Sequence, residues 1–310
     1  MKILVTGGAG YLGSVIVPRL LQARHSVTVL DNLMYRPESL FHVCGDPRFE
    51  FVAGDVRNEP LMKSLTQNAD AILPLAALVG APACARDPWL ATAVNVEAIR
   101  LLLTLRSPSQ LVIYPATNSG YGLTPGQTLC TEDTPLTPIS LYGKTKAEAE
   151  RAVLDAGHSI TLRLATVFGV SPRMRLDLLV NHFVYAAATD GYLVVFEKDF
   201  KRNYLHIQDV ADCVLHALDH AGAMAGGCYN AGLDSANLSK EELALKIREH
   251  VPSFVIHFAE VGSDPDRRNY VVSSRKLRNT GMMPHRTLDE GIVELLKAYR
   301  MLGRPSLKNA

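Results

Sequence analysis

The chain has 310 residues, 47% of them hydrophobic, and its 32 Lys and Arg residues nearly balance 31 Asp and Glu residues, which leaves a formal net charge of +1. This length and apolar content suffice for two ordinary domains or one large α/β unit, and they exclude a disordered chain, a collagen and a disulfide-stapled miniprotein. The balanced charge, without a long run of one sign, disfavours a nucleic acid or an anionic membrane as a partner.

The first 165 residues repeat a short run of Val, Ile and Leu, then a turn, then a stretch with helical spacing of apolar residues. This is the βαβ rhythm. Because the runs are continuously apolar, we expect strands covered by helices on both faces, as in the α/β class with a doubly wound parallel sheet of the Rossmann type. The predicted strands are Lys2–Thr6, Ser26–Asp31, Phe49–Ala53, Ala71–Leu75, Gln110–Tyr114 and Ile160–Leu164.

The rhythm breaks after residue 163. The pattern then predicts helices over 176–188, 209–221 and 288–301 and strands over 192–196 and 203–207. The strand at 203–207 and the helix after it are expected to return to the first domain. We therefore expect a Rossmann domain of residues 1–166 plus about 203–230, and a smaller mixed α/β domain of about 167–202 plus 231–310.

A glycine-rich turn follows the first strand directly. The segment TGGAGYLG at 6–13 has glycines at positions 7, 10 and 13, and a helical pattern follows it. Such glycines permit a tight turn, let backbone N–H groups approach a pyrophosphate, and let the helix pack closely on the strand. We therefore expect this turn to bind a dinucleotide.

Acidic residues at two later strand ends refine this expectation. Asp31 closes the second strand near the spacing at which a carboxylate binds both ribose hydroxyls of NAD, and it would repel the 2′-phosphate of NADP. Asp55 follows the third strand, where it could meet the adenine amino group. The pattern predicts NAD as the cofactor. The alternative for Asp31 is a solvated acid at a strand end.

Tyr142 and Lys146 share one face of a predicted helix, because they are four residues apart. A phenol with a pKa of ~10 is a poor base near neutral pH, but a neighbouring ammonium group and an oxidised nicotinamide would lower that pKa. Tyr142 then becomes a general-base candidate. A capped surface helix is the alternative, since Y-x-x-x-K is common by chance.

An ordered set of motifs resembles the extended short-chain dehydrogenase/reductase family, which includes the nucleotide-sugar epimerases and dehydratases. The set runs from TGGAGYLG, LDN, GDV and LAA through Asn95, a Thr four residues before Tyr-Gly, and Y-x-x-x-K to RNYLH, YNAG and DRRNY near the end of the chain. It covers essentially the whole chain. The resemblance implies a Rossmann fold, NAD as cofactor and a nucleotide-diphospho-sugar as substrate.

The resemblance also implies roles for single residues. It makes Thr117 the hydroxyl that hydrogen-bonds the reacting sugar oxygen, Tyr142 the acid/base, and Lys146 the bridge between the nicotinamide ribose and Tyr142. The expected cofactor contacts are these last two residues with Gly7, Gly10, Tyr11, Leu12, Gly13, Asp31, Asn32, Asp55, Val56, Leu75, Ala76, Ala77, Asn95, Leu164 and Ala165. The expected substrate contacts are Val79, Gly80, Asn118, Ser119, Arg175 and Asn181, with the diphosphate held by Arg202 and by Arg267 or Arg268.

Two departures from the family pattern narrow the reaction. The dehydratases carry an Asp or Glu pair directly after the catalytic Thr, where this chain has Asn118 and Ser119, so we do not expect 4,6-dehydration. Thr166 replaces an Asn that commonly contacts a sugar hydroxyl. The blocks at 75–82, 117–122 and 163–181 resemble one subgroup, the GDP-D-glycero-α-D-manno-heptose 4-dehydrogenases, which supply a 4-keto sugar for bacterial capsule heptoses.

We therefore expect NAD-dependent oxidation of the C4 hydroxyl of a nucleotide-diphospho-sugar, with a GDP-sugar favoured and a small α-keto acid as one candidate hydride acceptor. A nucleotide-sugar 4-epimerase shares the first chemical step, and a non-catalytic NAD-binding protein on the same fold is the alternative from another class.

Helices over 90–105 and 142–154 carry more apolar residues than one core-facing stripe needs, and equivalent helices pair in this family. We therefore expect a homodimer.

Several weaker signals complete the expectations. Five cysteines without a C-x-x-C pair fit a reducing cytoplasm, the first apolar run is too short for a signal peptide, and the apolar stretch 72–85 is too short for a membrane span. We expect a soluble cytoplasmic protein.

His216 and His220 share a helix face but have neither the Glu of a metalloprotease motif nor a third ligand, so we expect no metal site. His182 is expected to be a packing or surface residue.

Overall fold

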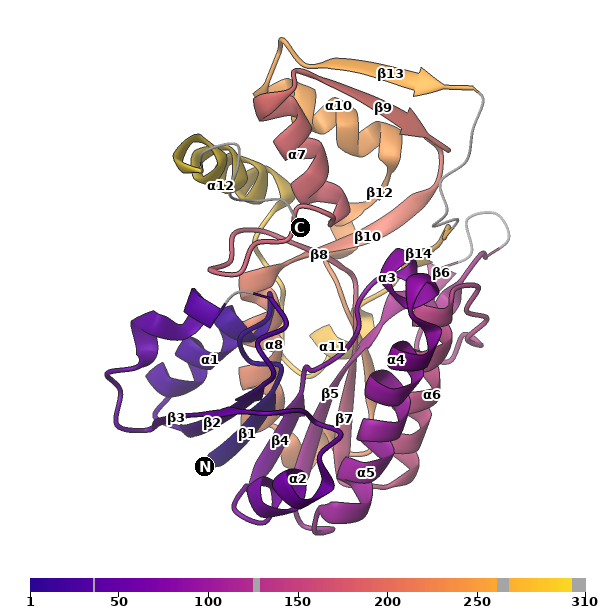
Figure 1. Cartoon of the computed structure of the whole chain (residues 1–310). Helices are drawn as coiled ribbons and strands as arrows, with labels where there is room; N and C mark the ends of the chain where they lie inside the picture. The colour runs from indigo at the N-terminus through magenta and orange to yellow at the C-terminus, as the bar shows by residue number, and fades with distance from the viewer. Residues whose placement is uncertain (36, 125–128, 261–267, 303–310) are drawn as a thin grey trace.

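The computed structural model describes residues 1–35, 37–124, 129–260 and 268–302. Its largest element is a seven-stranded sheet in the order β11-β7-β5-β4-β1-β2-β3 (Figure 1). All strand pairs in this sheet are parallel, so the predicted α/β fold with a doubly wound Rossmann-type sheet is confirmed. The strands are β1 (Lys2–Thr6), β2 (Ser26–Asp31), β3 (Phe49–Ala53), β4 (Ala71–Pro74), β5 (Leu111–Thr117), β7 (Ser159–Leu164) and β11 (Cys228–Ala231).

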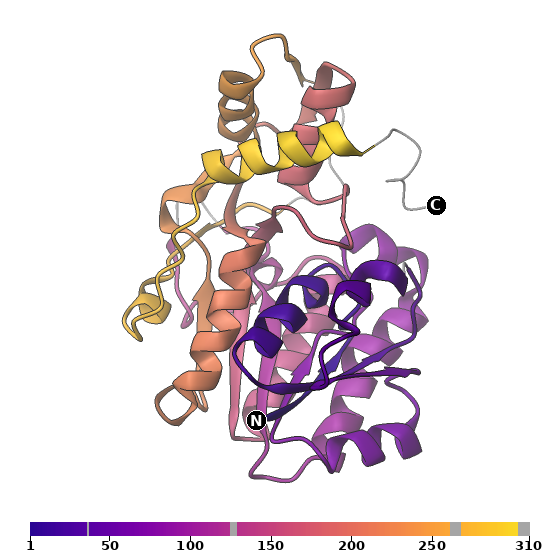
Figure 2. The same ribbon diagram turned by 90° about the vertical axis from the view of Figure 1, so that its left-hand side faces the viewer.

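Helices cover both faces of this sheet (Figures 1 and 2). Successive strand residues alternate between the faces: Val5 and Ile113 pack against α1 and α8, whereas Leu4 and Val112 pack against α2, α5 and α6. Burial on both faces explains the continuous apolar runs in the sequence. The helices of this layer are α1 (Gly13–Gln22), α2 (Glu59–Thr66), α3 (Ala81–Arg86), α4 (Pro88–Thr92), α5 (Ala98–Leu105), α6 (Leu141–Asp155) and α8 (Ile207–Asp219).

The helix predicted over 90–105 contains a π turn, Ala93–Glu97, between α4 and α5. Asn95 lies in this turn, and its side chain accepts from Leu78 N at 2.8 Å and donates to Leu78 O at 3.0 Å. The whole stretch Pro88–Leu105 has the length and hydropathy of a membrane span, with a third of it buried inside the protein. It packs against α6, and the core helix of a globular protein passes the same test, so this composition is weak evidence for a membrane.

A smaller layer lies above the large sheet (Figure 1). It contains a three-stranded sheet, β12-β10-β8, and a parallel pair, β13-β9. Phe168, Val184, Leu243 and Ile292 share its core. Its elements are β8 (Thr166–Phe168), β9 (Tyr192–Phe196), β10 (Lys201–His206), β12 (Asn237–Ser239), β13 (Val255–Ala259), α7 (Leu179–Thr189), α10 (Lys240–His250) and α12 (Leu288–Met301).

The chain passes between the two layers more than once. The strand predicted over 203–207 is β10, and it pairs with β8 and β12 rather than with the large sheet. Helix α8, which follows it, does pack on α1, and β11 pairs with β7. Other short elements are β6 (Leu129–Cys130) with its partner β14 (Val271–Val272), α9 (Ala221–Met224), α11 (Arg275–Arg278) and the 3-10 helices η1 (Pro37–Val43), η3 (Asn118–Tyr121) and η4 (Asp234–Ala236).

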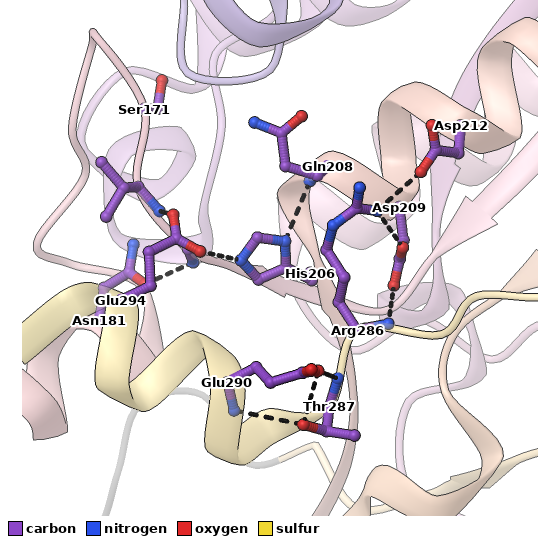
Figure 3. Close-up of polar contacts among 12 residues, drawn as sticks. Ser171, Asn181, His206, Gln208, Asp209, Asp212, Arg286, Thr287, Glu290 and Glu294 are labelled. Carbon is purple, nitrogen blue, oxygen red and sulfur yellow. Dashed lines mark hydrogen bonds and ion pairs between the residues drawn. The ribbon is translucent and has the colours of Figure 1, made fainter.

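The segment that leads into α12 is fixed to α8 by an arginine (Figure 3). Arg286 Nη1 donates to Asp209 at 2.6 Å and to Asp212 at 2.7 Å, and Arg19 of α1 binds the other oxygen of Asp212. The two carboxylates and His285 are close enough to one another to hold a cation. Because two guanidinium groups already neutralise the carboxylates, we interpret the cluster as an anchor for the last helix.

Candidate active site

A cavity of about 800 Å³ lies between the two layers, at the carboxyl ends of the large sheet, where ligands bind in α/β proteins. Its lining includes most of the residues that the sequence singled out: Gly7, Gly10, Tyr11, Leu12, Gly13, Asp31, Asn32, Asp55, Val56, Leu75, Ala76, Ala77, Val79, Gly80, Thr117, Ser119, Tyr142, Lys146, Leu164, Ala165, Arg175, Arg202 and Arg268. Asn95, Asn118 and Asn181 are not in the lining, and Arg267 lies outside the described residues.

The glycine-rich turn has the geometry that a pyrophosphate requires. Gly7 has a φ of +71°, and a Cβ there would lie 2.5 Å from the backbone nitrogen of Ala76. The turn can therefore lie this close to the loop after β4 only because residue 7 is a glycine. A Cβ on Gly13 would lie 2.5 Å from Gly8 Cα. No side chain caps the start of α1, and an uncapped helix N-terminus in a cavity favours a bound anion.

Asp31 is held in place by two backbone amides. Its Oδ2 accepts from Ala9 N at 2.9 Å, and its Oδ1 accepts from Leu33 N at 2.8 Å. Each oxygen keeps a further lone pair, so the carboxylate can still accept two hydroxyl groups. This donor and acceptor set fits the ribose diol of NAD, and its negative charge opposes a phosphate at the same position.

Asp55 also lines the cavity, but its carboxylate is engaged. Arg57 donates to both of its oxygens, at 2.8 and 2.7 Å, and these hydrogen bonds lower the pKa of Asp55 to about 2. The group is therefore ionised at neutral pH. The predicted contact with an adenine amino group would share these oxygens with Arg57.

Thr117 ends strand β5, and its hydroxyl begins a chain of hydrogen bonds that leads to Arg268. Thr117 Oγ1 donates to Ser119 Oγ at 2.9 Å, and Arg268 Nη1 donates to the same Ser119 oxygen. Asn118 is fully buried, and within the described part of the chain its side-chain polar atoms have no hydrogen-bond partner. Of the two residues that follow Thr117, only Ser119 therefore faces the cavity.

Helix α6 brings Tyr142 into the cavity. Ser140 caps the helix by accepting from Gly143 N at 3.1 Å, which fixes Tyr142 in the first turn. Burial raises the pKa of Tyr142, while the positive charges of Arg175 and Arg268 act in the opposite direction. A phenol in this environment needs nearby cations before it can act as a base at neutral pH.

Lys146 lies one turn further along α6, with its ammonium nitrogen 4.0 Å from the centroid of the Tyr114 ring. Burial lowers the pKa of Lys146 to about 7. The rise in the pKa of Tyr142 is opposed by Arg175, by Arg268 and by a hydrogen bond with Thr117. The expected support of Tyr142 by the Lys146 ammonium stays a prediction.

The smaller layer and the segments around it supply cations to the lining. They are Arg173, Arg175, Arg202, Lys240 and Arg268. Arg202 is 2% exposed and Lys240 is 3% exposed. Arg202 Nη1 donates to Lys201 O at 3.1 Å and Lys240 Nζ donates to Phe196 O at 3.0 Å, so these cations are fixed before any ligand arrives. Such a group of cations suits a diphosphate.

Some lining residues were not predicted. Arg173 could have been found, since it lies two positions before Arg175 in a segment already assigned to the substrate. Lys240 begins a helix and has no motif around it. His182, expected to be a packing or surface residue, also lines the cavity.

Asn181 supports the loop that carries the arginines of the 169–177 segment. Its Oδ1 accepts from Gly169 N at 3.0 Å, and its Nδ2 donates to Arg175 O at 2.9 Å and to Tyr11 Oη at 3.2 Å. The Tyr11 hydroxyl in turn donates to Gly169 O at 2.8 Å. The loop is therefore tied to the glycine-rich turn from behind the cavity wall.

Helix α12 fixes the same loop from the other side (Figure 3). One oxygen of Glu294 accepts from Val170 N at 3.1 Å, and the other lies 2.8 Å from Nε2 of His206. Since His206 ends β10, this carboxylate joins three elements of the smaller layer at one point.

Comparisons with known proteins identify the family of this chain. The model of the NAD dependent epimerase/dehydratase family matches residues 3–232. The dTDP-glucose 4,6-dehydratase of Actinoplanes sp. is 30% identical over 97% of this chain and 98% of that protein, and the UDP-glucose 4-epimerase of Lactobacillus helveticus is 28% identical over 97% of each. The low-salt glycan biosynthesis protein Agl12 of Haloferax volcanii is 30% identical over 96% of this chain and 98% of that protein.

Solved structures agree as well. DesIV, a dTDP-glucose 4,6-dehydratase from Streptomyces venezuelae with NAD and TYD bound, is 27% identical, has a TM-score of 0.83 and covers 97% of both chains. The UDP-glucuronic acid 4-epimerase of Bacillus cereus, with UDP-glucuronic acid and NAD, has the same fold, with a TM-score of 0.87 at 23% identity over 97% of this chain and 99% of that chain. The family match and the NAD complexes among the solved structures agree on one conclusion. This chain belongs to the NAD-dependent epimerase/dehydratase family, and its cofactor is NAD.

Proposed function

We propose that this chain is an NAD-dependent nucleotide-sugar 4-dehydrogenase. In this proposal it oxidises the C4 hydroxyl of a nucleotide-diphospho-sugar, first of all GDP-D-glycero-α-D-manno-heptose, to a 4-keto sugar for bacterial surface polysaccharide synthesis. The observation that carries the proposal is that Thr117, Tyr142 and Lys146 line one cavity together with the dinucleotide turn and a group of cations. The sequence blocks at 75–82, 117–122 and 163–181 support the heptose through their resemblance to that subgroup.

In this proposal, three residues act on the C4 hydroxyl and two arginines hold the diphosphate. Tyr142 removes the proton of the C4 hydroxyl, Thr117 shares the hydrogen bond to that oxygen, and Lys146 supports Tyr142 from the next turn of α6. When bound, NAD supplies the acceptor for the hydride that leaves C4. The hydroxyl thus loses a proton and a hydride, and the products are a ketone and NADH. Arg202 and Arg268 hold the diphosphate by charge-assisted hydrogen bonds.

Dehydration is not part of the proposal. It needs an acid and a base close to the catalytic Thr, and this chain has Asn118 and Ser119 there. The carboxylates in the described lining have other partners: two backbone amides for Asp31, Arg57 for Asp55, and Arg175 for Asp177. In our proposal, this chain therefore shares the first oxidation with the relatives named as 4,6-dehydratases, but it does not carry out the loss of water that follows.

A nucleotide-sugar 4-epimerase is the second candidate. It is favoured by full-length similarity to a UDP-glucose 4-epimerase, and its first chemical step is the same. In an epimerase the hydride returns to the other face of C4, whereas a dehydrogenase must pass it on, for which we propose a small α-keto acid. A non-catalytic NAD-binding protein is less well supported, because it would have no need to keep Thr117, Tyr142 and Lys146 in one cavity.

The same proposal covers the organisation of the chain. We propose that residues 1–166 plus about 203–230 bind NAD, that about 167–202 plus 231–310 bind the nucleotide sugar, and that the enzyme is a cytoplasmic homodimer. The dimer would form through α4, α5 and α6. Trp89 on α4 supports this, since it is 72% exposed.

A single-turnover experiment tests the proposal. The purified protein, loaded with NAD and freed of excess cofactor, is mixed with GDP-, UDP- and CDP-sugars that include GDP-D-glycero-α-D-manno-heptose. Nicotinamide absorbance is followed, and the products are identified by mass and NMR. Stoichiometric NADH with a 4-keto sugar is the expected result. Continuous formation of a C4 epimer without a lasting NADH signal would overturn it in favour of the epimerase, and no reaction with any sugar would favour the non-catalytic reading.

A further inference from the structure

Helix α6 carries a third ionisable residue, Glu150, that the mechanism above does not use. Glu150 is 2% exposed, although a glutamate is rarely buried unless it is paired. It follows Lys146 by four residues and Tyr142 by eight. Residues at these spacings lie on one face of a helix, so the phenol, the ammonium and the carboxylate form one row.

Arg163 of β7 holds this carboxylate. Its Nε donates to Glu150 Oε1 at 2.8 Å, and the Cys228 thiol of β11 donates to the same oxygen at 3.1 Å. The side chains of Arg163 and Glu150 are 8% and 3% exposed, so the ion pair is shielded from water. Arg163 Nη1 also donates to the Tyr121 hydroxyl at 3.0 Å and to Glu132 O at 3.1 Å. The guanidinium thus links α6 to the sheet and to the turn after Thr117.

The carboxylate acts on Lys146. Burial lowers the pKa of Lys146, and the attraction of Glu150 opposes that effect. Among the described residues, Lys146 lies over the Tyr114 ring of β5 and is attracted by Glu150 on α6, which Arg163 holds from the other side. Tyr142 lies one helical turn before Lys146. Glu150 is therefore the anionic member of this row, and Arg163 fixes where its charge lies.

We propose that Glu150 is a positioning residue for the oxidation: held by Arg163, it fixes α6 against the sheet and keeps positive charge on Lys146, where Tyr142 needs it. The effect on catalysis rests on the proposed function of Tyr142 and Lys146. The effect on the charge of Lys146 does not, because it exists whether or not the protein turns over a sugar.

Two roles must be separated by experiment. If Glu150 only neutralises the buried Arg163, then removing both charges should leave Lys146 as it is in the wild type. If Glu150 also supports the ammonium, then Lys146 should lose protons more easily even after Arg163 is neutralised. The double variant Glu150→Gln with Arg163→Gln makes this distinction, and it avoids an unpaired buried guanidinium that could unfold the single variant.

The charge of Lys146 is read directly by ¹³C NMR of the full chain labelled at the lysine Cε, with the signal assigned by its loss in Lys146→Met. We expect the titration midpoint of Lys146 to fall by roughly one pH unit or more in Glu150→Gln and to stay below the wild-type midpoint in the double variant. Glu148→Gln is the matched control, since Glu148 lies on the exposed side of α6, paired with Arg100, and should leave the midpoint unchanged.

The same variants are then assayed for NAD reduction across pH. We expect the rise of the rate with pH to move about one unit to higher pH in the Glu150 variants, because a neutral Lys146 no longer helps Tyr142 to ionise. A wild-type midpoint for Lys146 in the double variant would overturn the proposal and leave Glu150 as a partner of Arg163 alone. A lowered midpoint with an unchanged pH profile would keep the charge effect but refute its part in the oxidation, whereas a wild-type enzyme that never reduces NAD refutes only the proposed function.

Discussion

Replacing Lys146 by methionine should stabilise the folded protein, and the gain should depend on pH. Burial lowers the pKa of Lys146 from 10.5 to about 7, whereas the unfolded chain keeps the ordinary value. Between these two values the unfolded chain binds more protons than the folded one, so the free energy of unfolding rises with pH. The penalty for burying the lysine is therefore complete below about pH 7 and fades as the pH approaches 10.5.

The magnitude follows from the two pKa values. With one pKa unit equivalent to about 1.4 kcal/mol, the lysine destabilises the fold by about 5 kcal/mol at pH 6 and by about 2 kcal/mol at pH 9. Methionine has a similar length and no charge. Besides the attraction of Glu150, which the pKa of Lys146 already includes, it loses the cation–π contact with Tyr114, worth about 1 to 2 kcal/mol. The gain on replacement should thus be about 2 to 3 kcal/mol larger at pH 6 than at pH 9.

Urea unfolding of the wild type and of Lys146→Met at these two pH values measures the difference, with both proteins free of NAD. Lys144→Met is the control: Lys144 is exposed on the same helix, and its replacement should change the free energy of unfolding by less than about 0.5 kcal/mol at either pH. Equal gains for Lys146→Met at the two pH values, or a loss of stability at pH 6, would refute the reasoning.

Three further predictions concern the ligands and the assembly. Calorimetry should find that NAD binds far more tightly than NADP, because we expect Asp31 to accept the ribose hydroxyls and to repel a 2′-phosphate; similar affinities would remove that role. Tyr142→Phe should keep NAD affinity while the oxidation rate falls by about two to four orders of magnitude, and a retained rate would mean that the proton goes elsewhere. Light scattering at micromolar concentration should give the mass of a dimer, and a monomer would contradict the pairing of α4, α5 and α6.

The strands of the large sheet could be predicted well because their signal is local. β1, β2 and β3 begin and end at the predicted residues. β1 is an unbroken apolar run because it is buried on both faces, whereas β3 lies at the edge of the sheet and is only partly buried. β5 continues past the predicted end at Tyr114, because Pro115 to Thr117 still pair with β7. A proline in that position argues against a strand when the sequence is read alone.

The parts that failed depend on contacts between distant segments. Asn95 in the π turn forms hydrogen bonds with Leu78, and no local sequence pattern predicts these bonds. The strand predicted over 203–207 was expected to return to the first domain, but as β10 it pairs with β8 and β12. For the site, the motifs identified which segments meet at the cavity but not which way each side chain points. Asn118 and Asn181 are absent from the described lining, and their expected substrate contacts stay predictions.

The attachment of α12 to the loop after β8 has a practical consequence for anyone who shortens or tags this protein. Glu294 holds Val170, and the same loop is tied through Asn181 to Tyr11 in the dinucleotide turn. Removing residues 288–302 would therefore loosen a segment more than 100 positions away in the chain and, through it, the pyrophosphate cradle. Truncated forms should lose affinity for NAD and become sensitive to proteolysis near residue 170, although the last helix contributes no side chain to the described cavity lining.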